Sequence, residues 1–274
     1  MPHGRISPFR MAGARCNSST LHGSRCVFQT RYPHVSLNPD QRRSTRTMPQ
    51  ERVDETGLPM DIQGFPEHLL TGYRNFMSGR FNEQQQRYKT LAESGQKPKT
   101  MVIACCDSRA APETIFDSGP GELFVVRNVA NMMPPYEPDG HYHSTSAALE
   151  FAVQSLRVTN IVVMGHGRCG GIKAALDPDA EPLSPGDFIG RWMNLLKPAA
   201  EQIQSNDVMT QAERQRALER VSIRNSIANL RTFPCVNILE SKGKLRLHGA
   251  WFDISTGELW VMDAKTGDFS RPGM

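Results

Sequence analysis

The 274-residue sequence lacks any stretch that could span a bilayer, because no run approaches the roughly 18 to 20 uninterrupted apolar residues needed. Its N-terminus also lacks the apolar run of about 7 to 15 residues that marks a secretory signal. No phosphate-loop pattern G-x-x-x-x-G-K-[ST] occurs, and no internal repeat is visible. These absences argue against a membrane protein, a secreted protein and a nucleotide-binding P-loop enzyme.

Negative charge is almost missing from the first 50 residues, which hold eight Arg, no Lys and the single acid Asp40. This segment has a net charge of +7, so the rest of the chain carries the balance, −3, of the overall +4. The Arg residues lie among Ser, Pro, Thr and Asn without helical or strand periodicity, unlike the basic face of a nucleic-acid-binding domain. No nucleic-acid partner is therefore expected.

The same composition predicts that residues 1–58 form an unstructured extension and that residues 59–274 form the folded domain. Two interpretations of the extension stay open. Residues 1–47 have the Arg-rich, Ser-rich and acid-poor composition of an organelle transit peptide. Alternatively, translation begins at Met48, after which acids appear at once. The expected location is the cytoplasm, with an organelle as the alternative if the transit peptide is genuine.

Six cysteines could in principle form three disulfides. In an intracellular enzyme of this size, however, clustered Cys near His and Asp more often mark metal or catalytic chemistry than a disulfide framework. We therefore interpret the cysteines near His and Asp, at positions 105, 106 and 169, as candidates for metal binding or catalysis.

The apolar pattern predicts an α/β fold with a mostly parallel central sheet flanked by helices. Three short apolar runs that end in polar residues are typical of buried parallel strands and lie within 99–109, 121–131 and 160–171. Helical spacing occurs over 65–95, 144–158 and 223–233, and the first of these predicts an N-terminal helical arm. Residues 245–263 read as two strands joined around 255–257, which predicts an antiparallel C-terminal strand. Ligands of such sheets bind at the carboxyl ends of the strands.

Two short motifs follow predicted strands and carry the chemistry. Cys105, Asp107 and Arg109 are two residues apart, so an extended backbone would point all three to one side. His166 and Cys169 are three apart, and a turn opening into a helix can bring them onto one face.

Two Cys and one His are soft or borderline ligands that suit Zn²⁺ better than Mg²⁺ or Ca²⁺. Cys106 would face away from Cys105 on a strand, which makes it a poor fourth ligand. Three protein ligands and an open position are typical of catalytic zinc.

The paired motifs C-x-D-x-R and H-x-x-C resemble the zinc-binding signature of β-class carbonic anhydrases. The resemblance continues through 121–135, 165–173 and 247–261 and covers roughly residues 60 to 265. It implies that zinc is bound by Cys105, His166 and Cys169, with Asp107 and Arg109 as the catalytic dyad. The implied reaction is the reversible hydration of CO₂ to bicarbonate and a proton, by attack of zinc-bound hydroxide on CO₂.

The resemblance favours the plant-like subtype, whose substrate-pocket positions fall at Gln96, Phe124, Val129, Phe151 and Gly170. Val102 stands where other members carry the Trp of an inhibitory bicarbonate site, and Phe151 stands where Tyr is usual. In this family the pocket is built at a dimer interface, which implies a homodimer or a higher even homo-oligomer, with Gln96 serving the neighbouring subunit's zinc.

Two other functions stay open at this point. A related hydrolase on the same zinc scaffold would act on carbonyl sulfide or carbon disulfide. A non-catalytic protein would use zinc only to staple an interaction module. The presence of Asp107 and Arg109 beside an open zinc position argues against the second.

Overall fold

We describe the protein from a computed structural model that defines residues 65–140 and 142–273. The predicted extension over residues 1–58, and the first residues of the domain predicted over 59–274, lie outside the described residues. No helix of the described part is long and apolar enough to cross a membrane.

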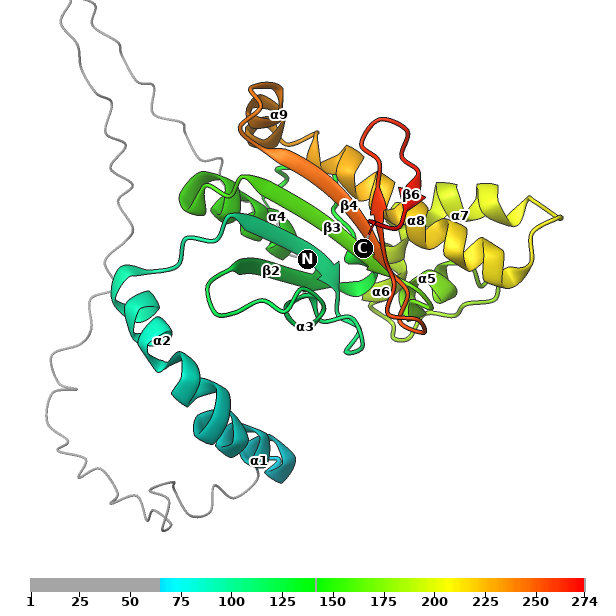
Figure 1. Cartoon of the computed structure of the whole chain (residues 1–274). Coiled ribbons are helices and arrows are strands. Elements are labelled where there is room, and N and C mark those ends of the chain that lie inside the picture. The colour runs from blue at the N-terminus through cyan, green and yellow to red at the C-terminus, as the bar shows by residue number, and fades with distance from the viewer. Residues whose placement is uncertain (1–64, 141, 274) are drawn as a thin grey trace, which may run out of the picture. The chain divides into compact units, whose positions relative to one another are not determined.

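A six-stranded sheet forms the centre of the described chain, in the order β2-β1-β3-β4-β5-β6 (Figure 1). Its strands are β1 (Thr100–Cys105), β2 (Leu123–Asn128), β3 (Asn160–His166), β4 (Arg246–Phe252), β5 (Leu259–Met262) and β6 (Phe269–Ser270). The first four in this order pair in parallel, and β5 and β6 add antiparallel strands at one edge. The predicted fold class is confirmed, although β6 was not predicted.

The parallel strands are apolar because both of their faces are covered. Along β1, Met101 and Ile103 enter one core cluster, whereas Val102 and Ala104 enter a smaller cluster on the opposite face. This alternation is the period of two expected of a strand. Both faces of β1 therefore exclude water, and polar groups follow where the strand ends.

Helical segments make up most of the remaining described residues. They are α1 (Glu67–Phe76), η2 (Met77–Phe81), α2 (Asn82–Ser94), α3 (Pro112–Ile115), η3 (Val129–Asn131), α4 (Ser144–Glu150), η4 (Phe151–Leu156), α5 (Gly170–Ala175), α6 (Phe188–Met193), η5 (Asn194–Leu196), α7 (Lys197–Gln204), α8 (Gln211–Leu230) and α9 (Pro234–Ser241). Residues of α4, η4, α8 and α9 cover the face of the main cluster. A second cluster under α5, α6, α7 and α8 surrounds Cys105 and Cys169.

The helix α8 is longer than the predicted segment 223–233, because it begins at a capping box formed by Thr210 and Glu213. Two glycines let it approach the sheet. A Cβ at Gly165 or at Gly249 would lie 2.9 Å from the side chain of Ile223. The close contact brings the polar residues of α8 to the carboxyl end of β3.

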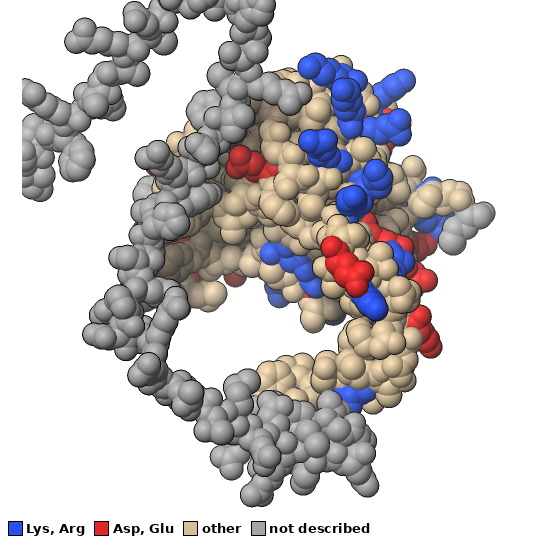
Figure 2. Space-filling view, turned by 90° about the vertical axis from the view of Figure 1, so that its left-hand side faces the viewer, with Lys and Arg blue, Asp and Glu red and all other residues tan. Residues whose placement is uncertain are grey.

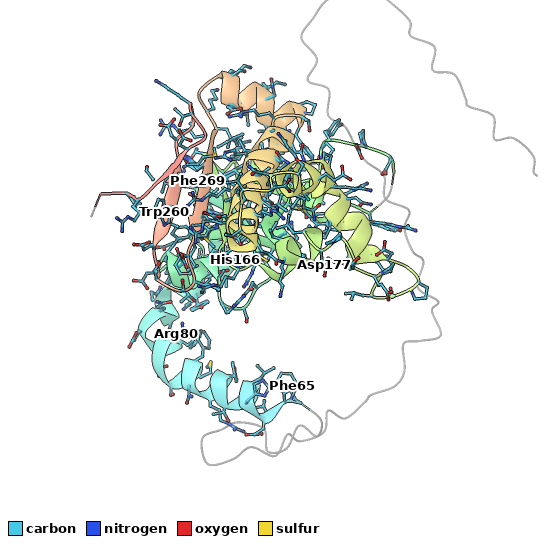
Figure 3. The ribbon with its side chains drawn as sticks, turned by 90° about the vertical axis from the view of Figure 1, so that its right-hand side faces the viewer. Phe65, Arg80, His166, Asp177, Trp260 and Phe269 are labelled. Carbon is cyan, nitrogen blue, oxygen red and sulfur yellow. The ribbon has the colours of Figure 1, made fainter. Side chains whose placement is uncertain are left out.

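The predicted N-terminal arm is confirmed as α1, η2 and α2, and none of its residues is buried. Its second half is anchored by Arg87, whose guanidinium donates to Pro120 O at 2.8 Å and to Glu122 Oε1 at 2.9 Å. Phe65 and Arg80 lie on the arm, away from the side chains of the sheet and its covering helices (Figure 3).

The extra strand β6 is held by a cation between aromatic rings. The guanidinium of Arg220, from α8, lies 5.0 Å from the ring centre of Trp251, 5.2 Å from that of Trp260 and 5.4 Å from that of Phe269. Such contacts are worth about 0.5 to 2 kcal/mol each. They fasten the antiparallel strands to α8, and Trp260 and Phe269 mark this edge in Figure 3.

Candidate metal centre

The candidate ligands lie at the carboxyl ends of neighbouring parallel strands. Cys105 is the last residue of β1 and His166 the last residue of β3. The chain then turns through Gly167 and Arg168, which adopts the left-handed conformation with φ 56°, so that Cys169 stands at the start of α5. His166 lies among the side chains of the sheet and its helices (Figure 3).

The three donor atoms are close enough to share one ion. The Sγ atoms of Cys105 and Cys169 and a ring nitrogen of His166 all lie within 4.8 Å of one another. The two sulfur atoms are 3.9 Å apart. In a tetrahedral zinc site with Zn–S bonds of about 2.3 Å, two sulfur atoms lie roughly 3.8 Å apart. All three residues are buried, with exposed fractions of 5% or less.

His166 carries the clearest sign of a missing partner. Its Nδ1 lies 2.9 Å from Gly167 O, and a carbonyl oxygen can only accept, so Nδ1 holds the proton. The neutral ring then presents a lone pair at Nε2, which is buried without a hydrogen-bond partner in the part of the chain that the structure describes. Buried polar nitrogens are rarely left this way, and a metal ion would satisfy this one.

The thiols are poised to act as ligands. The pKa of Cys105 is lowered to about 4, mainly because the Cys169 thiol donates a hydrogen bond to its thiolate. The same hydrogen bond, together with burial, raises the pKa of Cys169, so the two thiols titrate as a pair. Metal binding requires thiolates, and a cation between the sulfur atoms would replace the shared proton. The donor set and its geometry therefore fit zinc.

Asp107 and Arg109 form a fork beside the ligands. The Arg109 side chain donates to Asp107 Oδ1 at 2.9 Å and to Oδ2 at 2.7 Å, and its backbone N–H donates to Oδ1 at 3.0 Å. These bonds hold the pKa of Asp107 well below its usual range. Asp107 Oδ2 lies 3.8 Å from His166 Nε2, too far for a hydrogen bond. The strand ends at Cys105, so this pair forms in a turn rather than along the extended backbone that the alternation predicted.

A second arginine, Arg127 on β2, fixes the turn that carries the fork. Its guanidinium donates to Cys105 O at 2.8 Å and to Asp107 O at 2.7 Å. Cys106 between them is exposed, as predicted for a residue that faces away from the ligand. Arg127 lies within the predicted strand segment 121–131, but no local pattern indicated its role in the turn.

The turn that carries Cys169 is held from α8 by a buried carboxylate. Glu219 accepts from Cys169 N at 3.1 Å and, through its other oxygen, from Trp251 Nε1 at 3.0 Å. Gln215, one helical turn earlier, donates to Cys169 O at 3.2 Å. Only 3% of Glu219 is exposed, and this burial raises its pKa. Sequence reasoning missed Glu219, because it lies outside the predicted helical segment 223–233 and a lone Glu gives no signal of burial.

The structure divides the five predicted pocket residues into two groups. Val129 and Gly170 lie close to the centre: Val129 packs on the cluster that contains the two ligand thiols, and Gly170 follows Cys169 directly. Gly170 faces open space, since a Cβ there would meet no atom within 4 Å.

The second group lies away from the chain's own ligands. Gln96 is exposed and precedes β1, whereas Cys105 ends that strand. Phe124 is the second residue of β2 and lies four residues before Asn128, the register partner of Cys105. Phe124 and Phe151 contact each other, with ring centres 5.9 Å apart, and Phe151 is 49% exposed.

Comparison with known proteins places this arrangement in a family. The carbonic anhydrase family model matches residues 100–259. Beta carbonic anhydrase 3 of Arabidopsis thaliana is 37% identical over 205 residues, which cover 73% of this chain and 78% of that protein.

Two solved structures share the fold. The β-carbonic anhydrase CcaA is 28% identical, with a TM-score of 0.70 over 76% of this chain and 92% of its own. A tetrameric β-carbonic anhydrase from the ascomycete Sordaria macrospora is 26% identical, with a TM-score of 0.62 over 74% and 98%. The chain thus combines a Cys-His-Cys cluster at the strand ends with the fold and the sequence similarity of these relatives. It belongs to the β-class carbonic anhydrases.

Proposed function

We propose that the protein catalyses the reversible hydration of CO₂ to bicarbonate and a proton, with zinc as its cofactor. One observation carries the proposal: the Cys105, His166 and Cys169 donor atoms converge within 4.8 Å beside an ionised Asp107. Zinc held there would supply Lewis acidity that lowers the pKa of a water molecule toward neutrality. Two thiolates and a neutral imidazole would together balance the charge of the cation.

In this reaction Asp107 orients the water that is consumed. An ionised carboxylate accepts hydrogen bonds and cannot donate them, so a water or hydroxide beside Asp107 Oδ2 must turn its hydrogen toward that oxygen. Its lone pair is then directed elsewhere, toward the substrate. Arg109 keeps the carboxylate ionised and fixes its position through two charge-assisted hydrogen bonds.

The substrate side of the site is proposed to need a second copy of the chain. CO₂ is small and nonpolar, and Val129 and the open backbone at Gly170 offer it an apolar wall from within the chain. Gln96, Phe124 and Phe151 lie away from the chain's own ligands, so we propose that they serve the partner's metal in a homodimer or higher even oligomer. The exposed aromatic residues of the arm, Phe65 at 50% and Tyr73 at 48%, support such an interface.

The first experiment measures zinc content and CO₂ hydration by stopped flow for the parent and for Cys169→Ser. The variant should lose most of its zinc and its activity together. Cys235→Ser is the matched control, because Cys235 is a free, partly buried thiol on α9 outside the metal cluster. Full zinc occupancy in Cys169→Ser would refute the ligand assignment. A parent faster on carbonyl sulfide or carbon disulfide than on CO₂ would refute the substrate.

A complementation experiment tests the shared pocket. Gln96→Ala and Asp107→Asn are co-expressed with different tags, and the mixed dimer is isolated. If Gln96 serves the partner's metal, one of the two sites in the mixed dimer is intact, and the mixed dimer regains about half of the parent rate. If Gln96 serves its own metal, each site carries one defect and the mixed dimer stays as slow as the single variants.

A further inference from the structure

Cations gather at the opposite ends of the same strands, where the chain enters the sheet. Lys99 precedes β1, Arg157 lies before β3, and Lys244 and Arg246 lie at the start of β4. The backbone ties these positions together, because Thr159 N donates to Lys99 O at 2.8 Å and Arg246 N donates to Thr159 O at 3.0 Å. Figure 2, which faces this end of the strands, shows Lys and Arg side chains crowded over its upper part.

These four cations have no matching acid among the residues that the structure describes. None of them forms an ion pair within 4.0 Å or donates a side-chain hydrogen bond there. The pKa of His248, two residues along β4 from Arg246, is lowered first by burial and then by the positive charge of Arg246. Unmatched charge of one sign beside a concave surface concentrates ions of the opposite sign.

A hollow of about 780 Å³ opens between three of these cations, Arg157, Lys244 and Arg246. It is lined by Val153, Gln154, Arg157, Val158, Thr159, Asn160, Leu239, Gly243, Lys244 and Arg246. Its volume falls within the roughly 300 to 1,000 Å³ of small-molecule sites. We name it the amino-end pocket.

Most neutral donors of this pocket are already engaged. The backbone N–H groups of Thr159 and Asn160 donate to Lys99 O, and that of Lys244 donates to Leu239 O. The Thr159 hydroxyl donates to Lys99 O at 3.3 Å, and the Asn160 side-chain oxygen lies 3.0 Å from His248 Nε2. The walls are therefore fixed by internal hydrogen bonds, and the donors left for a ligand are chiefly cationic side chains.

We propose that the amino-end pocket binds a small oxyanion with two or more negative charges, of the phosphate-ester or polycarboxylate type. Two guanidinium groups and one ammonium line it, and guanidinium forks match the paired oxygens of both anion types. The pocket is separate from the metal centre, since the seven residues of β3 between them span about 20 Å at roughly 3.3 Å per residue. The inference therefore goes beyond CO₂ hydration.

Calorimetric titration of the zinc-loaded full chain in about 0.1 M NaCl tests the proposal. Fructose 1,6-bisphosphate is the phosphorylated probe, tricarballylate is the polycarboxylate probe, and fructose is the uncharged control. The variant Arg157→Gln/Arg246→Gln should bind the preferred anion at least tenfold more weakly than the parent. The charge-matched variant Lys89→Gln/Lys265→Gln removes two exposed cations from α2 and from the turn after β5, and should bind within twofold of the parent.

Both double variants should keep the parent's CO₂ hydration rate and melting temperature, which shows that they are folded. Three results would overturn the proposal. The first is that neither anion binds the parent at millimolar concentration. The second is that both double variants weaken binding equally, because the anion would then respond to net charge alone. The third is that Arg157→Gln/Arg246→Gln binds like the parent, because the anion would then bind outside the amino-end pocket. A single-stranded 20-nucleotide oligomer that binds over a hundredfold tighter than either anion would assign the surface to a nucleic acid instead.

Discussion

The two ends of the parallel strands use charge in opposite ways. At the carboxyl ends, the charged side chains beside the candidate ligands have fixed partners: Arg109 holds Asp107, and Glu219 of α8 accepts from the backbone of the Cys169 turn. At the amino ends, Arg157, Lys244 and Arg246 stand exposed around a hollow without partners among the described residues. Both ends share one backbone framework, because β1, β3 and β4 run through the sheet between them.

The difference shows what preorganisation requires. A catalytic site needs side chains that are held in place by further hydrogen bonds. At the carboxyl ends of the strands, which we call the metal end, Arg127, Glu219 and Gln215 supply these hydrogen bonds. Electrostatic attraction of a multivalent anion needs only charge on a rigid rim, which the amino end provides. Substitutions at the metal end should therefore act through geometry, and those at the amino end through charge.

The largest effect should come from Asp107→Asn. The amide keeps the size of the carboxylate but presents a donor in place of one acceptor, so it cannot orient water in the same way. CO₂ hydration should fall by about 100-fold or more, the scale of losing one positioned hydrogen-bonding group, while zinc content stays at about one per chain. Stopped-flow rates and metal analysis check this.

Arg109→Ala should give the same result by another route, because Asp107 loses its clamp while the three metal ligands remain. If either variant hydrates CO₂ at the parent rate across pH 7 to 9, the pair is only a structural ion pair.

A smaller effect is expected from Glu219→Gln. The amide has one acceptor, so either Cys169 N–H or Trp251 Nε1–H must face an NH₂ group. Zinc affinity, measured by competition with a chelator, should fall by about 10-fold to 100-fold, as is typical when a ligand loses its outer support. Glu201→Gln, at an exposed carboxylate on α7, is the control and should leave the affinity unchanged. An unchanged affinity in Glu219→Gln would show that other contacts suffice to hold Cys169.

Glu219 also marks the limit of what the sequence reveals. The cluster of Cys105, His166 and Cys169 and the Asp107–Arg109 ion pair could be predicted, because each motif is local, with spacings of two and three residues after an apolar run. Glu219 lies 50 residues beyond Cys169, and only the packing of α8 on Gly165 and Gly249 brings the two together. Such a contact is set by tertiary structure, and no local pattern records it.

The fold shows the same division. The strands β1, β2 and β3 were predictable because buried parallel strands leave continuous apolar runs. The strand β6 has only two residues, and it depends on Phe269 contacting Arg220 and Arg224 of α8. The helices α6, η5 and α7 were not predicted either, and α8 was predicted only from residue 223 onward. Their apolar residues face the second cluster, which forms only once α5, α6, α7 and α8 are assembled.

The close packing that delivers Glu219 can be tested through Gly249→Ala. The added methyl would lie 2.9 Å from both Ile223 Cγ2 and Met262 Cβ, so α8 or β5 must shift. The free energy of unfolding should fall by about 1 to 3 kcal/mol, a usual cost of overpacking. Gly79→Ala in the arm is the control, because a Cβ there meets nothing within 4 Å, and it should be neutral or stabilising by up to about 1 kcal/mol. Denaturation midpoints at equal protein concentration compare the two, and equal midpoints would contradict the packing argument.

The smallest effect is predicted for a chain that starts at Met48. Residues 1–47 lie outside the described residues, and their composition, rich in Arg and Ser and poor in acids, predicts no apolar core. The shortened chain should keep the parent's CO₂ hydration rate and melting temperature. It should also keep the anion affinity of the amino-end pocket within about twofold, although eight Arg have been removed, because the proposed binding depends on Arg157, Lys244 and Arg246. If the shortened chain lost only its anion binding, the anion would be assigned to the Arg-rich segment. The amino-end pocket would then not be an anion site, and the proposed difference between the two ends of the strands would be wrong. A large loss of hydration or melting temperature would show that residues 1–47 support the fold.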